Sequence, residues 1–178
     1  MTQFTPKRIK RNFVQQFQAP ISEVFPLLCP IREYEWIEPW KGEMLHSESG
    51  VAEKNCIFRT GFFGEPPKTG LSGEPLSDVW VITHYEPNSR IEFVRMNSLR
   101  TSCLSITLTD NGDGSTRSVV EQLLVGLTEQ GNESLEVIAD NFTFEWSMGE
   151  AMLNHYLTTG KRLALQEAVA VALQQRCI

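Results

Sequence analysis

Carboxyl side chains that lie close together in the sequence are the residues of this chain best suited to proton transfer. They occur as two pairs, Glu33 with Glu35 and Glu145 with Glu150. A carboxyl group in an apolar cavity has a raised pKa and can act as a general acid or base. Glu35 and Glu145, each followed by a tryptophan, are the two carboxyl candidates for catalysis, and His84 is the third candidate. The alternative is that both carboxyls face solvent on amphipathic helices, as most glutamates do.

The sequence contains no clear motif for a metal or cofactor site. The three histidines, His46, His84 and His155, are far apart, and none lies in a motif with the tight spacing of zinc ligands. The segment 110–115 resembles a calcium loop but lacks the required glycine at its sixth position, so it is better explained as a hairpin turn. We therefore expect no metal site and no cofactor.

Aromatic side chains offer a second kind of chemistry, the binding of an apolar molecule. Ligand pockets are mostly apolar and aromatic, with a few polar groups that orient the ligand. Arg95 is a candidate polar anchor, and so is Arg59. The aromatic candidates for ligand binding are Trp36, Trp40, Phe58, Trp80, Phe93, Phe142 and Trp146. Ordinary core packing explains the same aromatic residues, so both interpretations stay open.

Short strand-like runs make up the region that would position these residues. They are 7–17, 42–47, 55–62, 79–86, 90–96, 101–109 and 116–128. Turn-forming residues at 86–89 and 110–114 predict two hairpins, and successive hairpins favour an antiparallel sheet. Alternation in 101–109 predicts that Leu104, Ile106 and Leu108 face the core. The run 79–86 is apolar on both faces, so its inward face is not predicted.

Helical patterns flank the strands. Ser22 could cap a short helix that ends before Pro30, and 31–40 could form a second short helix with Tyr34, Trp36, Ile37 and Trp40 facing inward. Apolar residues recur at helical spacing from Ser134 to Gln174, and this long helix could end near Gly160. The irregular segment 61–78, rich in Gly and Pro, is either a lid over a pocket or a simple crossover.

Size and composition limit the classes of function. The chain has 178 residues, enough for one domain spanning 1–178. Its net charge of −6 argues against general binding to nucleic acid or anionic membranes. No apolar run approaches the ~18–20 residues that span a bilayer, and the N-terminus does not resemble a signal peptide. We therefore expect a cytoplasmic protein whose four cysteines are buried free thiols.

The order of elements, together with three segments, resembles a known superfamily. The segments are Leu28–Trp36, Trp80–Pro87 and Asn154–Lys161. They resemble a small bacterial branch of the START-like (SRPBCC) superfamily, which includes birch-pollen-allergen proteins and polyketide cyclase/dehydrase-type families. The resemblance covers nearly the whole chain. It implies an α+β helix-grip fold: a curved antiparallel sheet of six to seven strands around a long C-terminal helix, with two short helices after the first strand.

Three functions are consistent with that resemblance. The first is binding of a small hydrophobic or amphipathic molecule, such as a lipid, in a cavity of ~300 Å³ or more between sheet and helix. The second is a cyclase- or dehydratase-type enzyme that uses Glu35, Glu145 or His84 for proton transfer. The third is a partner-binding module that resembles activators of a chaperone ATPase and needs an exposed apolar patch. A homodimer is possible in each case.

Overall fold

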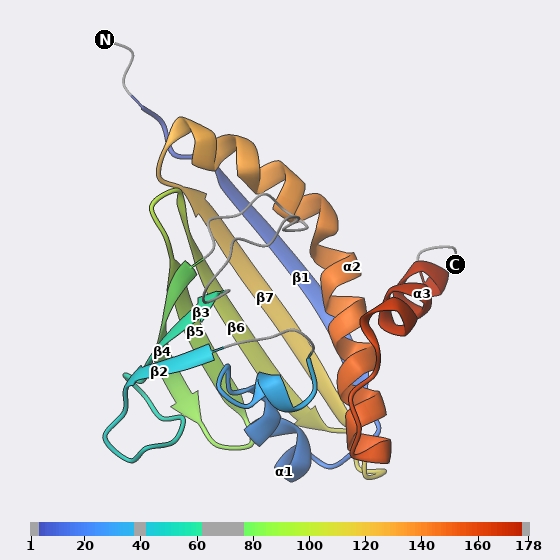
Figure 1. Ribbon diagram of the computed structural model, residues 1–178. Helices are drawn as coiled ribbons and strands as arrows, with labels where there is room; N and C mark the ends of the chain where they lie inside the picture. The colour runs from blue at the N-terminus through green and yellow to red at the C-terminus, as the bar shows by residue number, and fades with distance from the viewer. Residues whose placement is uncertain (1–3, 38–41, 62–76, 176–178) are drawn as a thin grey trace.

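The computed structural model describes residues 4–37, 42–61 and 77–175, which form a helix-grip fold (Figure 1). One antiparallel sheet with the strand order β1-β7-β6-β5-β4-β3-β2 is covered by a long helix near the C-terminus. The elements are β1 (Arg8–Phe17), α1 (Ile21–Val24), η1 (Phe25–Leu28), η2 (Glu33–Glu35), β2 (Gly42–His46), β3 (Ile57–Gly61), β4 (Ser77–Glu86), β5 (Arg90–Met96), β6 (Arg100–Asp110), β7 (Thr116–Gly126), α2 (Glu129–Thr159) and α3 (Leu165–Gln175). The predicted α+β helix-grip fold is confirmed.

Local turn chemistry builds most of the sheet. β4 pairs with β5, and β6 pairs with β7, through the two hairpins that the sequence predicts. Asn88 in the first turn has a φ of 58°, and Gly112 in the second has a φ of 83°. Both residue types tolerate this left-handed conformation better than most. The last strand, β7, also pairs with β1, which places the two ends of the strand region side by side.

The inner face of the sheet follows the predicted alternation in β6 but not in β4. Leu104, Ile106 and Leu108 are buried, as predicted. In β4, Trp80 and Ile82 face inward, and a strict two-residue period would place residue 84 inward as well. An irregularity in the β4–β5 register between Ile82 and His84 changes this. Tyr85 therefore packs inward, with its ring 5.4 Å from that of Phe25, and His84 faces solvent.

The short helical segments after β1 form a cap at one end of the sheet; the first is α1 continued directly by η1, and the second is η2. The first begins at Ile21 after Pro20, and Ser22 makes no capping hydrogen bond, which corrects the expected start. Trp36, directly after the second segment η2, is buried, but Tyr34 within η2 is half exposed, which corrects the expected inward position of Tyr34. Side chains three residues apart align on a 3₁₀ turn, so Glu33 and Trp36 share a side and Tyr34 does not. Trp40 and the segment 62–76, which holds most of the proposed lid, lie outside the described residues.

The long helical pattern divides into two helices. α2 begins earlier than predicted, at Glu129, because Thr128 caps it by accepting a hydrogen bond from the Gly131 N–H at 2.9 Å. It ends where Gly160 adopts a left-handed φ of 67°, as the sequence indicated, and α3 follows. Gly149 lies inside α2 without interrupting it. None of the described helices is long and apolar enough to span a membrane.

Side chains of α2 hold the free edge of β1. Asn154 Oδ1 accepts from the backbone N–H of Gln18 at 2.9 Å, and its Nδ2 donates to the carbonyl of Gln16 at 2.8 Å. Glu150 accepts from the Gln16 N–H at 2.7 Å, and Asn132 accepts from the Lys7 N–H at 2.8 Å. These bonds satisfy edge groups that would otherwise be open to pairing with another strand. They also fix the helix along one side of the sheet (Figure 1).

We expect Asn154→Ala to lower the free energy of unfolding by about 1–2 kcal/mol, because two hydrogen bonds to β1 are lost. Urea titration followed by circular dichroism measures this change. Asn141→Ala is the matched control, since Asn141 lies on the same helix and, among the described residues, no hydrogen bond joins its side chain to β1. Equal stability of the two variants would show that the edge bonds do not hold the helix in place.

Candidate functional site

A cavity of about 200 Å³ lies between the inner face of the sheet, the cap and α2. The described residues that line it come from η1, from η2 and the two residues after it, from β4 to β7, and from α2. They are Leu28, Glu33, Trp36, Ile37, Trp80, Phe93, Arg95, Arg100, Ser102, Leu104, Ile106, Gln122, Leu124, Ile138, Glu145, Trp146 and Gly149. The volume is smaller than the expected ~300 Å³, and three tryptophans are among the residues that line it.

The aromatic walls present apolar surface to the cavity. The indole N–H of Trp36 donates to the Leu27 carbonyl at 3.0 Å, and that of Trp80 donates to Thr60 Oγ1 at 2.7 Å. Phe93 packs edge-to-face on Trp80, with ring centroids 5.7 Å apart. Because the protein itself uses both indole N–H groups, these two residues contact a ligand through their hydrocarbon surfaces. Polar recognition must therefore come from other side chains.

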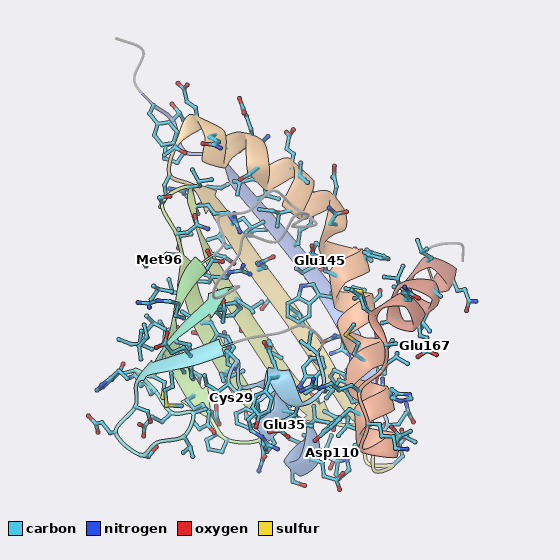
Figure 2. All side chains as sticks on the ribbon, viewed as in Figure 1. Cys29, Glu35, Met96, Asp110, Glu145 and Glu167 are labelled. Carbon is cyan, nitrogen blue, oxygen red and sulfur yellow. The ribbon has the colours of Figure 1, made fainter. Side chains whose placement is uncertain are left out.

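The polar groups of the cavity are divided by charge between its walls. The sheet supplies two arginines, Arg95 and Arg100, and the covering elements supply two carboxyls, Glu33 on η2 and Glu145 on α2. Figure 2 shows Glu145 on the side of α2 that faces the sheet. A ligand in the cavity would lie between hydrogen-bond donors on one side and carboxyl groups on the other.

Four contacts hold side chains on the arginine side of the cavity in place. Arg95 forms an ion pair with the buried Asp78, and its guanidinium lies 4.9 Å from the centre of the Trp80 ring. Asn97 Nδ2 donates to the other oxygen of Asp78 at 2.6 Å. On the neighbouring strands, Gln122 Nε2 donates to Ser102 Oγ at 2.8 Å. The side chains of this wall are therefore set in position before a ligand binds, which lowers the entropic cost of binding.

Glu33 is the titratable group most strongly affected by the cavity. Burial raises the pKa of its carboxyl to about 8, and the nearby positive charge of Arg95 opposes this rise only in part. Its side chain is not sealed in the core, because it borders the cavity. At neutral pH Glu33 therefore holds a proton and can donate it in a hydrogen bond or in a reaction.

Glu35, the candidate selected from the sequence, lies in a different environment. Arg32 donates two hydrogen bonds to its carboxylate, at 2.6 and 2.9 Å, and Tyr156 Oη donates a third at 3.1 Å. The bonds from Arg32, more than any other contact, lower the pKa of Glu35, which is not among the cavity-lining residues. Arg162 of the segment after α2 also donates to the Tyr34 and Glu35 carbonyls. This carboxylate thus ties the cap to the end of α2 (Figure 2).

The structure brings together part of the set proposed from the sequence. Glu145 and five of the ligand-binding candidates border the cavity, namely Trp36, Trp80, Phe93, Arg95 and Trp146. Phe58 and Phe142 are buried in the core beside it, and the Phe142 ring lies 6.0 Å from that of Trp146. His84 lies on the outer face of the sheet, 3.7 Å from Glu86, and Arg59 is exposed beside Glu43 at 3.6 Å.

Several residues that line the cavity were not among the candidates chosen from the sequence. For some of them, the sequence pattern does indicate an inward side chain. The alternation that predicts an inward Leu104 extends back to Ser102 and Arg100, both of which are buried. The spacing of three residues between Glu33 and Trp36 indicates a shared side on a 3₁₀ turn. Gln122 left no such signal, because its inward direction depends on its pairing opposite Leu104.

A larger depression of about 560 Å³ lies on the opposite, solvent-facing side of the sheet. Charged and polar side chains such as Lys10, Glu92 and Glu121 make up much of its lining. Such groups are well solvated in water and gain little from a small ligand. Cys103 borders this depression and is exposed, which corrects the expectation that every cysteine is buried. The inner cavity, with its ionisable side chains and aromatic walls, is therefore the candidate site.

Comparison with known proteins supports the fold. No family model matches the chain, and no curated protein matches it. Among solved structures, DynU16, a protein of the dynemicin biosynthetic locus, has a TM-score of 0.59 at 19% identity; the match covers 85% of this chain and 48% of DynU16. CalU16 from Micromonospora echinospora has a TM-score of 0.51 at 14% identity, covering 96% of this chain and 93% of CalU16. Ara h 8.0201 has a TM-score of 0.59 at 10% identity, covering 86% of this chain and 99% of the other.

These similarities establish a shared helix-grip fold and nothing finer, since every identity is below 20%. The chain also spans only about half the length of DynU16. The choice of ligand or reaction must therefore be argued from the cavity itself.

We predict that Glu33→Gln changes how stability depends on pH. The unfolded chain releases the Glu33 proton near the ordinary pKa of 4.5, whereas the folded protein holds it to about 8. Between these values the folded state binds more protons, so the free energy of unfolding of the wild type falls as pH rises. Because Gln does not ionise, the stability of the variant relative to wild type should increase by on the order of 4 kcal/mol between about pH 5 and pH 8.

Urea titrations across this pH range measure the effect, and Glu35→Gln is the control. The pKa of Glu35 is lowered, so its stabilising effect is present above its ordinary pKa and is lost as pH falls through the folded value. Glu35→Gln should therefore destabilise the protein at neutral pH. Parallel pH curves for wild type and Glu33→Gln would contradict the assignment of Glu33 as a protonated cavity acid.

Proposed function

We propose that residues 1–178 form a single ligand-binding domain that holds a small amphipathic molecule between the sheet, the cap and α2. The observation that carries this proposal is a cavity of about 200 Å³ that combines aromatic walls with four ionisable side chains. Cavities that serve only as packing defects are usually apolar. A cavity with arginines and carboxyls in its walls is better explained by a ligand that bonds to them.

The balance of surfaces supports an amphipathic ligand. Trp80, Phe93 and Leu104 contribute apolar surface, and burying apolar ligand surface against them is favourable by about 25 cal/mol per Å². Arg100 and Ser102 are themselves buried, and a ligand without polar atoms would displace water from the cavity without replacing its hydrogen bonds. A purely hydrocarbon ligand is therefore a poor fit. The cavity volume of about 200 Å³ also limits the part of the ligand that it encloses to a small molecule or group.

We predict that the neutral fluorescent probe N-phenyl-1-naphthylamine binds the wild-type protein and that Ile106→Phe weakens its binding about 10-fold. Ile106 lies in the cavity wall, and a larger ring there overlaps with the probe. Val119→Phe is the control, because Val119 belongs to the neighbouring strand and alternates with the buried Ser118 and Val120. Fluorescence titration gives the Kd values. Equal Kd values for the two variants, or no binding to wild type, would refute the proposed site.

A second candidate function is proton-transfer catalysis of the cyclase or dehydratase type. It is favoured by the raised pKa of Glu33 and by the second cavity carboxyl, Glu145, on a different element. In the step we propose, the Glu145 carboxylate takes a proton from the carbon beside a ligand carbonyl. The electrons of that C–H bond form a carbon–carbon double bond, and the carbonyl oxygen takes the proton of Glu33. The reverse transfer restores both groups, so no further reactant is needed.

We predict that the protein accelerates exchange of the α-hydrogens of 2-tetralone in deuterium oxide, because this exchange is the same enolisation. Proton NMR follows the loss of the α-hydrogen signal. Glu33→Gln and Glu145→Gln should each reduce the rate by about 100-fold or more, whereas Glu92→Gln, on the outer face, should leave it unchanged. If wild type and both cavity variants exchange the ketone at the rate of buffer alone, the catalytic candidate is excluded and ligand binding stands by itself.

A further inference from the structure

Three glycines in or beside α2 have clear structural explanations. A Cβ at Gly126 would overlap with Asn132, and a Cβ at Gly131 would overlap with the Leu99 carbonyl. Gly160 ends the helix with a φ of 67°, which side chains disfavour. In each case a larger residue would disturb the fold.

Gly149 has no such explanation. It lies well inside a helix of 31 residues, where glycine is the poorest helix former apart from proline. It has no positive φ, and a Cβ built on it would meet no atom of the described residues within 4 Å. The fold would therefore accept alanine here and gain from it. What distinguishes the position is that it borders the cavity, so the empty space in front of it belongs to the candidate site.

We propose that Gly149 is the specificity-determining residue of the cavity and that its missing side chain admits a flat, ring-bearing ligand against the backbone of α2. This inference rests on the proposed ligand-binding function. Cα–Cβ bonds of a helix tilt toward its N-terminus, so the space left by Gly149 lies over the preceding turn, which carries Glu145 and Trp146. A ring placed there would contact the helix backbone on one side and the aromatic wall of the sheet on the other.

The shape of the remaining wall favours a flat ligand over a branched chain. Trp36 and Trp80 are held by hydrogen bonds from their indole nitrogens, and Phe93 is packed against Trp80. These rigid ring surfaces cannot follow a branched ligand by changing rotamer. Flat surfaces on the sheet and bare backbone on the helix leave a space that a ring fills with the largest contact area.

The test combines ligand binding with stability for Gly149→Ala and Gly149→Leu. Gly149→Ala should raise the urea midpoint of unfolding, because no described residue lies within 4 Å of a Cβ at this position and alanine is the better helix former. We expect Gly149→Ala to weaken binding of N-phenyl-1-naphthylamine about 3-fold and Gly149→Leu about 30-fold or more, since the added atoms occupy the space of the ring. A Gly149 variant that is stable but binds the probe less well would show that Gly149 determines specificity and is not required for the fold.

Thr143→Ala is the matched control, because Thr143 is an exposed residue of the same helix that does not border the cavity. It should raise the urea midpoint and leave the Kd unchanged. If wild type binds the probe and the Gly149 variants bind it equally well, the inference is overturned while the proposed function stands. If Gly149→Ala lowers stability, the glycine has a structural role and the inference also fails. If wild type itself binds no probe, the proposed function fails, and this inference fails with it.

Discussion

The attachment of α2 to the free edge of β1 is the interaction on which the cavity depends. Asn132, Glu150 and Asn154 bond to the β1 backbone, so the helix packs on β1 and β7 at one side of the sheet. Side chains from the inner faces of β4 to β7 line the cavity together with the cap and α2. A helix centred over the sheet would fill this space with core residues. The same bonds protect β1 from pairing with other chains.

The cap shows how two neighbouring carboxyls take opposite roles. Glu35 is ionised and bonded to Arg32 and Tyr156, so it joins the cap to α2. Glu33, two residues earlier, is turned into the cavity, where burial keeps it protonated at neutral pH. Burying an acid in this way lowers the free energy of unfolding as the pH rises towards its raised pKa. Its presence is therefore best explained by the site, and the bonds of Glu35 are what hold it there.

Other proteins share the fold of this chain, but they do not indicate which residues line its cavity. Structures with 10–19% identity share the helix-grip arrangement, because many sequences satisfy the same pattern of strands and one long helix. The charges and glycine of this cavity are individual side chains, and the fold alone does not specify them. The proposed functions therefore depend on individual residues of the cavity, namely Glu33, Glu145, Arg100 and Gly149.

The sequence by itself determined the elements with local causes. Turn residues predicted the hairpins at 86–89 and 110–114, alternation predicted the inward face of β6, and Gly160 indicated the end of α2. Only the tertiary structure decided the positions of His84, Glu33 and Glu35. The register shift in β4 depends on its pairing with β5, and the choice between two glutamates depends on Arg32, Arg95 and Tyr156. Local pattern encodes each element, whereas burial and charge at a site arise from residues far apart in the chain.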